Sequence, residues 1–87
     1  MKTEFEYFSM EELHDCKGST KQWFCMGKGC QLGLVKWYGA WRQYVFYPEC
    51  DTIFSSGCLT DIVNFLTEVN ELHKLDLIKR KKEANNE

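Results

Sequence analysis

The stretch 32–47, LGLVKWYGAWRQYVFY, most constrains how this chain can fold. Two runs rich in aromatic and β-branched residues flank Gly39-Ala40. Glycine at the first position of a two-residue loop suits the type II′ turn of a β-hairpin. The pattern therefore predicts strands over 31–38 and 41–47, closed by a tight turn.

A further strand is predicted over 20–26, because aromatic and apolar residues continue there. Lys28-Gly29 would centre the turn that joins it to the hairpin. Glycine is favoured at such a turn, whereas lysine with a positive φ is not, so a longer loop is an open alternative. Pro48 should end the last strand, since it has no N–H to donate.

An amphipathic helix is predicted after residue 57, because apolar residues recur at spacings of three and four. They are Leu59, Ile62, Val63, Leu66, Val69 and Leu72, with a weaker continuation through Leu75 and Ile78. Phe65 lies off this stripe, and Ser55 or Ser56 can cap the helix. The cations of 79–82 would oppose the dipole charge at its C-terminus.

The N-terminal segment offers a capping box, with Ser9 as N-cap and Glu12 reaching back. This predicts a short helical turn over 10–16; an irregular polar loop is the alternative. The fold class expected is therefore α+β, a three-stranded antiparallel meander packed on one long C-terminal helix. We expect a single domain over 1–87, with its core at about 5–75 and a basic, frayed tail at about 79–87.

Hairpin register predicts which side chains share a face of the sheet. The predicted turns place Val35 opposite Tyr44, Trp23 opposite Leu34, and Gly33 between two phenylalanines, Phe24 and Phe46. One face then carries Trp23, Cys25, Leu32, Leu34, Tyr38, Trp41, Val45 and Tyr47. The other carries Phe24, Met26, Val35, Trp37, Tyr44 and Phe46, with Gln22, Gln31 and Arg42.

Both predicted faces are apolar, whereas a sheet with one solvated face should alternate between apolar and polar residues. One helix can cover one face, and the uncovered face predicts a homo-oligomer. In the alternative, Phe5, Tyr7, Phe8 and the 10–16 turn cover the second face and the chain is a monomer.

Charge and hydropathy exclude some classes of protein. The net charge of −2 argues against a general nucleic-acid binder. No apolar run reaches the ~18–20 residues that span a bilayer, and the start MKTEFEYF lacks the apolar core of a signal peptide. We therefore expect no membrane contact and a cytoplasmic location.

Five cysteines stand at 16, 25, 30, 50 and 58. Their odd number argues against a disulfide framework. No CxxC pair is present, and strand alternation separates Cys25 from Cys30, so buried thiols are favoured over a zinc site with His14. No nucleophile elbow or phosphate loop accompanies the histidines, and His73 fits an exposed helix position. We expect no enzymatic activity, metal or cofactor.

The best candidate site is the aromatic hairpin tip, which combines rings with hydrogen-bonding and cationic side chains. Its residues are Trp37, Tyr38, Trp41, Arg42, Gln43 and Tyr44. Arg42 opposite Trp37 suits a cation–π pair. Such a surface could hold a nucleobase or phosphate, or anchor a protein partner, because Trp, Tyr and Arg dominate interface hot spots. In the alternative, these rings are simply core.

The WYGAWRQYVFYP run of 37–48 and the CLTDI run of 58–62 resemble a set of small uncharacterised bacteriophage and prophage proteins. Those proteins carry a pattern like WYxPWRQYxFxP followed by CLxDI at the start of a helix. The resemblance covers roughly 31–66, and Ala40 stands where the set has a proline. It implies a phage or mobile-element origin and the cytoplasm of a bacterial host.

These observations predict a non-enzymatic phage accessory protein that acts as a homo-oligomer. Its expected partner is a host protein, for example in counter-defence, or a small nucleotide-like ligand. The alternative is a nucleic-acid-binding regulatory protein that uses Arg42, Lys36, Lys21 and the basic tail. Phosphate contacts would make the affinity of such a protein fall steeply with salt.

Overall fold

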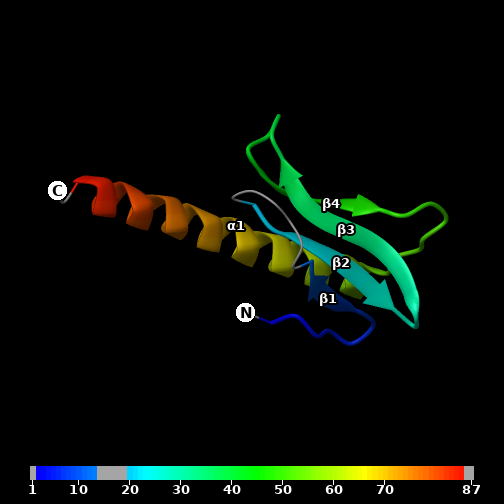
Figure 1. Cartoon of the computed structure of the whole chain (residues 1–87). Coiled ribbons are helices and arrows are strands. Elements are labelled where there is room, and N and C mark those ends of the chain that lie inside the picture. The colour runs from blue at the N-terminus through cyan, green and yellow to red at the C-terminus, as the bar shows by residue number, and fades with distance from the viewer. Residues whose placement is uncertain (1, 14–19, 86–87) are drawn as a thin grey trace.

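A computed structural model of the protein describes residues 2–13 and 20–85. Within these residues the fold is α+β, with a four-stranded antiparallel sheet and one long helix along one of its faces (Figure 1). The strands pair in the order β1-β2-β3-β4, as in a meander. The elements are β1 (Ser9–Glu12), β2 (Gln22–Gly27), β3 (Cys30–Tyr38), β4 (Gln43–Pro48) and α1 (Ser56–Asn85).

Strand β1 replaces the predicted helical turn over 10–16, so the prediction of three strands and an N-terminal turn is wrong. The side chains from Phe8 to Glu11 alternate between buried and less buried, and Met10 pairs with Cys25 of β2. This period of two belongs to a strand, and it outweighs the capping-box pattern. Residues 14–16 of the predicted turn lie outside the described residues.

The β2–β3 turn is a two-residue loop, because Gly27 pairs directly with Cys30. Lys28 and Gly29 both have positive φ, 51° and 75°, as a type I′ turn requires. The longer loop that lysine suggested does not form. Cross-strand pairing supplies the free energy that holds Lys28 in this disfavoured conformation.

A β-bulge at Leu32 then shifts the register, so that Trp23 pairs with Val35 and not with Leu34. The bulge lets both Leu32 and Val35 pack on the core side, which strict alternation would forbid. The predicted assignment of β2 side chains to faces is therefore wrong. Gly33 pairs with Cys25 and Pro48 rather than with Phe24 and Phe46, but the Phe46 ring still lies over it, in the space that a Cβ would fill.

The β3–β4 connection is a four-residue loop, 39–42, because Tyr38 pairs with Gln43. The predicted two-residue turn at Gly39-Ala40 is wrong. Arg42 takes the left-handed conformation with φ 51°, and the Trp41 N–H donates to the Tyr38 carbonyl at 3.2 Å. The register differs from the prediction by two residues, which leaves the side chains of 34–38 and 44–47 on their predicted faces.

The core lies between the sheet and α1, with Trp23, Val35 and Phe46 in register on that face. The opposite face presents half-exposed apolar side chains to solvent: Phe24, Leu34, Val45 and Tyr47. Phe5 and Phe8 pack on the helix side, where the Phe5 and Phe65 rings meet at 6.4 Å. The alternative in which these two residues cover the second face is therefore wrong.

Helix α1 begins at the predicted cap, where the Cys58 N–H donates to Ser55 Oγ at 3.2 Å. Phe65, expected off the apolar stripe, is buried with 1% of its surface exposed, less than Ile62 or Val69 of the same helix. Asn70, His73 and Lys74 still meet the β3–β4 end of the sheet, and beyond them the helix extends as a projecting rod (Figure 1). The basic segment 79–82 lies within α1, which continues to Asn85.

Candidate functional site

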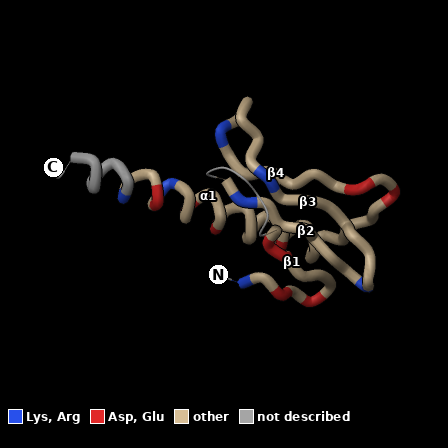
Figure 2. The backbone as a smooth tube through the Cα atoms, viewed as in Figure 1, with Lys and Arg blue, Asp and Glu red and all other residues tan. Residues whose placement is uncertain are grey.

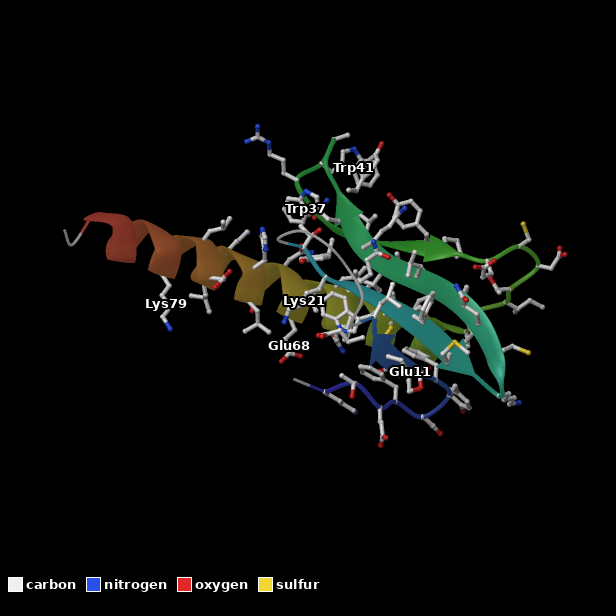
Figure 3. The ribbon with its side chains drawn as sticks, viewed as in Figure 1. Glu11, Lys21, Trp37, Trp41, Glu68 and Lys79 are labelled. Atoms are coloured by element: carbon white, nitrogen blue, oxygen red, sulfur yellow. The ribbon has the colours of Figure 1, made fainter. Side chains whose placement is uncertain are left out.

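A cleft lies between the 39–42 loop and α1, and we name it the tip cleft. Its volume is about 250 Å³. Its lining residues are Trp37, Trp41, Arg42, Gln43, Asn70, His73 and Lys74. Figure 3 shows Trp37 and Trp41 at the loop end of the sheet. Four of the six residues predicted for the hairpin site therefore line one concave surface.

Trp37 forms the floor of the tip cleft, because its ring is half-buried between β4 and the helix. It meets the Tyr44 ring at 5.3 Å and the His73 ring at 4.6 Å. Arg42 lies in the loop and not opposite Trp37 in the sheet, so the predicted cation–π pair is wrong. The four-residue loop is the physical reason, since it moves Arg42 out of the strand.

Trp41 is the most exposed aromatic residue of the site, with 66% of its surface accessible. Its ring packs edge-on against Tyr38 at 5.0 Å, which limits its rotation. Tyr38 is 37% exposed and belongs to the other face of the sheet, so it supports Trp41 from outside the cleft. An exposed tryptophan whose ring is fixed by a neighbouring side chain is typical of residues that contribute most to binding at interfaces.

Tyr44 belongs to the core, although the sequence placed it among the candidate site residues. Only 4% of its surface is exposed, and its ring packs against Trp23 at 5.6 Å. Its hydroxyl oxygen accepts a hydrogen bond from the Lys21 backbone N–H at 3.1 Å. Tyr44 therefore positions Trp37 and His73 from below and offers no surface to a ligand.

The tip cleft is locally cationic, although the chain has a net charge of −2. Arg42 from the loop and Lys74 from the helix are both exposed, and the described lining residues include no carboxylate. Figure 2 shows acidic residues along the N-terminal segment, in the loop after β4 and on α1, where none of them lines the cleft. The cleft is thus suited to a negatively charged group beside an aromatic or apolar one.

Three lining residues were not predicted from the sequence: Asn70, His73 and Lys74. His73 was expected to be an exposed surface residue, but it is half-buried against Trp37 and Tyr44. Its spacing of three from Asn70 puts both polar side chains on one side of the helix. The signal available in the sequence was two polar residues, Asn70 and His73, beside the apolar stripe of the helix. Their role becomes visible only in the structure, where α1 packs against β4.

The cysteines do not form a second site among the described residues. No group of three or more His, Cys, Asp or Glu side chains in 2–13 and 20–85 could hold a metal ion. Cys25 is fully buried, and burial with the nearby Cys58 raises the pKa of its thiol to about 11. His14 and Cys16 lie outside the described residues.

The cations named for nucleic-acid binding do not share one surface. Lys36 lies over the Tyr47 ring at 4.7 Å on the outer face of the sheet. Lys21 pairs at 3.8 Å with Glu12 of β1, the edge strand opposite β4. Arg42 lies at the tip cleft. The described part of the chain contains no helix with the length and apolar character to cross a membrane.

Comparison with known proteins gives one informative similarity. Over 43 residues the chain is 30% identical to an uncharacterized 9.3 kDa protein of Acholeplasma phage L2. The match covers 49% of this chain and 55% of the relative, so the chain spans about half the length of the relative it matches. No protein-family profile and no solved structure matches the chain. The chain is thus similar to a small phage protein, as its sequence resemblance implied.

Proposed function

We propose that the chain is a non-enzymatic accessory protein of a phage or another mobile element, which binds a host protein through the tip cleft. The observation that carries this proposal is the exposed Trp41, held by Tyr38 beside a cleft with two cations. We place its action in the cytoplasm of the bacterial host. Components of host defence systems are the partners to test first.

The size of the tip cleft favours a macromolecular partner over a free small molecule. At about 250 Å³ it is smaller than the ~300–1,000 Å³ of typical ligand pockets. It fits one or two side chains of a larger partner, with the rest of that partner lying over the loop. Trp and Arg are also the residue types that most often carry interface free energy.

The charge of the tip cleft defines the chemistry of the partner segment. Arg42 can bind a carboxylate with two parallel hydrogen bonds, and Lys74 adds a second positive charge. The indoles of Trp37 and Trp41 offer flat apolar surface next to these cations. The partner segment that fits is an exposed loop with an acidic residue beside an aromatic or long aliphatic one.

A peptide-display selection on the immobilised chain tests this proposal. We expect enrichment of sequences that place Asp or Glu beside a large apolar residue. Trp41→Ala and Arg42→Ala should each lower the affinity for the selected peptide at least tenfold. Ile53→Ser is the matched control, because Ile53 is 93% exposed and lies outside the cleft. No enrichment, or equal loss in the control, would contradict the proposal.

Binding of nucleotides tests the alternative partner. A mononucleotide could stack on Trp41 and place its phosphate on Arg42. Titration calorimetry with AMP and with a short single-stranded DNA should show no saturable binding. Micromolar binding of either one, lost in Trp41→Ala, would replace the protein partner by a nucleotide-like ligand or a nucleic acid.

We further propose that the chain self-associates. The outer sheet face and the projecting part of α1 both present apolar side chains that no described element covers. Surfaces of this kind usually mark an interface.

A further inference from the structure

Helix α1 carries a regular stripe of four residues at positions 68, 72, 75 and 79. Spacings of four, three and four place these residues along one side of a helix, as in the a and d positions of a coiled coil. They are Glu68, Leu72, Leu75 and Lys79. In Figure 3, Glu68 and Lys79 point to the same side of α1, away from Trp37 and Trp41.

The two leucines of this stripe are exposed, although Asn70, His73 and Lys74 on another side of the same helix segment contact the sheet. The exposed fraction is 48% for Leu72 and 61% for Leu75. An isolated helix of about 12–15 residues is only marginally stable in water. A projecting rod with exposed leucines therefore needs a partner surface to be stably ordered.

The order of charges along the stripe identifies that partner as a second copy of this chain. We infer that two copies pair through residues 68–79 of α1 in antiparallel orientation. Antiparallel pairing sets each a position against a d position of the partner, so Leu72 of one copy packs on Leu75 of the other. The same register sets Glu68 of each copy against Lys79 of the other.

The same four residues disfavour parallel pairing of the two helices. It would set Glu68 against Glu68 and Lys79 against Lys79, and like charges at adjoining positions are destabilising. The antiparallel arrangement gives two leucine layers flanked by two oppositely charged pairs, related by a twofold axis. The order acid–Leu–Leu–base therefore selects the orientation as well as the partner.

This interface lies on the opposite side of α1 from the tip cleft. Asn70, His73 and Lys74 line the cleft and are absent from the stripe. Each copy of a dimer would keep its cleft open to a partner protein. The inference rests on the proposed self-association and is independent of the cleft as a binding site.

Sedimentation of the full chain under reducing conditions tests this pairing. The wild-type chain should show a concentration-dependent equilibrium between monomer and dimer. Glu68→Lys and Lys79→Glu should each raise the dimer dissociation constant about tenfold or more, because each replaces two attractive pairs by two repulsive ones. Glutamate and lysine are both good helix formers, so α1 should remain folded.

Mixing the two variants gives the decisive arm. One copy with Glu68→Lys and one with Lys79→Glu again oppose unlike charges in both layers, so a heterodimer should form at wild-type affinity. The double variant Glu68→Lys/Lys79→Glu should likewise recover a homodimer. Circular dichroism of each single variant checks that dissociation does not reflect unfolding.

Val45→Glu on the outer sheet face is the matched control, since its new carboxylate can pair with Lys36 across the strands. It should leave the dimer unchanged. If Val45→Glu alone dissociates the dimer, self-association stands but occurs through the sheet, and the helix pairing is wrong. A wild-type chain that is monomeric at all concentrations overturns both the pairing and the proposed self-association. Neither result bears on peptide binding at the cleft.

Discussion

Asn70 of α1 binds both backbone groups of Tyr44 in edge strand β4. The Tyr44 N–H donates to Asn70 Oδ1 at 2.7 Å, and Asn70 Nδ2 donates to the Tyr44 carbonyl at 3.2 Å. The amide therefore acts as a short additional strand on the open edge of the sheet. It also joins the strand that carries one wall of the tip cleft to the helix that carries the other.

Asn70→Ala should lower the free energy of unfolding by about 1–3 kcal/mol, because it leaves a part-buried backbone N–H and carbonyl without their partner. Asn64→Ala, at an exposed position of the same helix, is the control and should change it by less than about 0.5 kcal/mol. Urea unfolding of the wild-type chain and of the two variants measures both changes in the free energy of unfolding. Equal stabilities would mean that the amide does not hold the edge strand.

Gly33→Ala should also destabilise the fold, by about 1–3 kcal/mol, through overpacking. A Cβ at this position would lie 2.7 Å from the Tyr47 carbonyl oxygen and would overlap the Phe46 ring. Gly39→Ala is the matched control, because a Cβ added there would meet no atom within 4 Å and the φ of Gly39 is not positive. That control should be neutral or slightly stabilising in thermal unfolding. A Gly33→Ala protein as stable as the control would contradict the close packing of Phe46.

Lys28→Asn should stabilise the protein by about 0.5–1 kcal/mol, since asparagine tolerates the left-handed conformation that Lys28 adopts at φ 51°. Asn-Gly is the preferred sequence of a type I′ turn. Lys36→Asn would show that the gain is not a general effect of removing a lysine. The midpoint of urea unfolding measures the change, and a decrease would argue for a different turn type.

Stability should fall between pH 9 and pH 11 because of Cys25. Its thiol has a pKa raised from 9.0 to about 11 in the folded protein, chiefly by burial. Above pH 9 the unfolded chain loses this proton while the folded chain keeps it, so alkaline pH favours the unfolded state by about 2 kcal/mol in all. Below pH 9 both states are protonated and the contribution vanishes.

Comparison with Cys25→Ala isolates this effect from other alkaline titrations. The difference in unfolding free energy between the two proteins should narrow as pH rises from 9 to 11. A pH-independent difference would mean that the thiol is not desolvated. At pH 8, a thiol reagent should modify the exposed Cys30 and Cys50 rapidly and Cys25 only after unfolding.

The sequence predicts the pairing of β2 with β3 and of β3 with β4, and the long helix, because their signals are local. Period-two alternation gives β3 and β4, the Lys28-Gly29 turn is where expected, and Ser55 caps α1. The bulge at Leu32 is not local, since it lets Leu32 and Val35 both pack on the core side of the sheet. One inserted residue was enough to exchange the predicted faces of β2.

Part of the candidate site could be predicted for the same reason. Trp37, Trp41, Arg42 and Gln43 are neighbours in sequence, and the structure keeps them together at the cleft. His73 and Asn70 arrive from the helix, and their place depends on how α1 crosses β4. Tyr44 shows the reverse case, because an aromatic residue in the same run becomes core once the helix covers it.

The indole N–H signals of Trp23, Trp37 and Trp41 in a two-dimensional NMR spectrum show whether a partner binds at the tip cleft. On addition of a selected acidic peptide, the signals of Trp37 and Trp41 should shift in proportion to occupancy. The signal of Trp23, which is buried on the far side of Tyr44, should remain in place. Saturable binding with no change at Trp37 and Trp41 would show that the partner binds elsewhere and that the tip cleft is not the site.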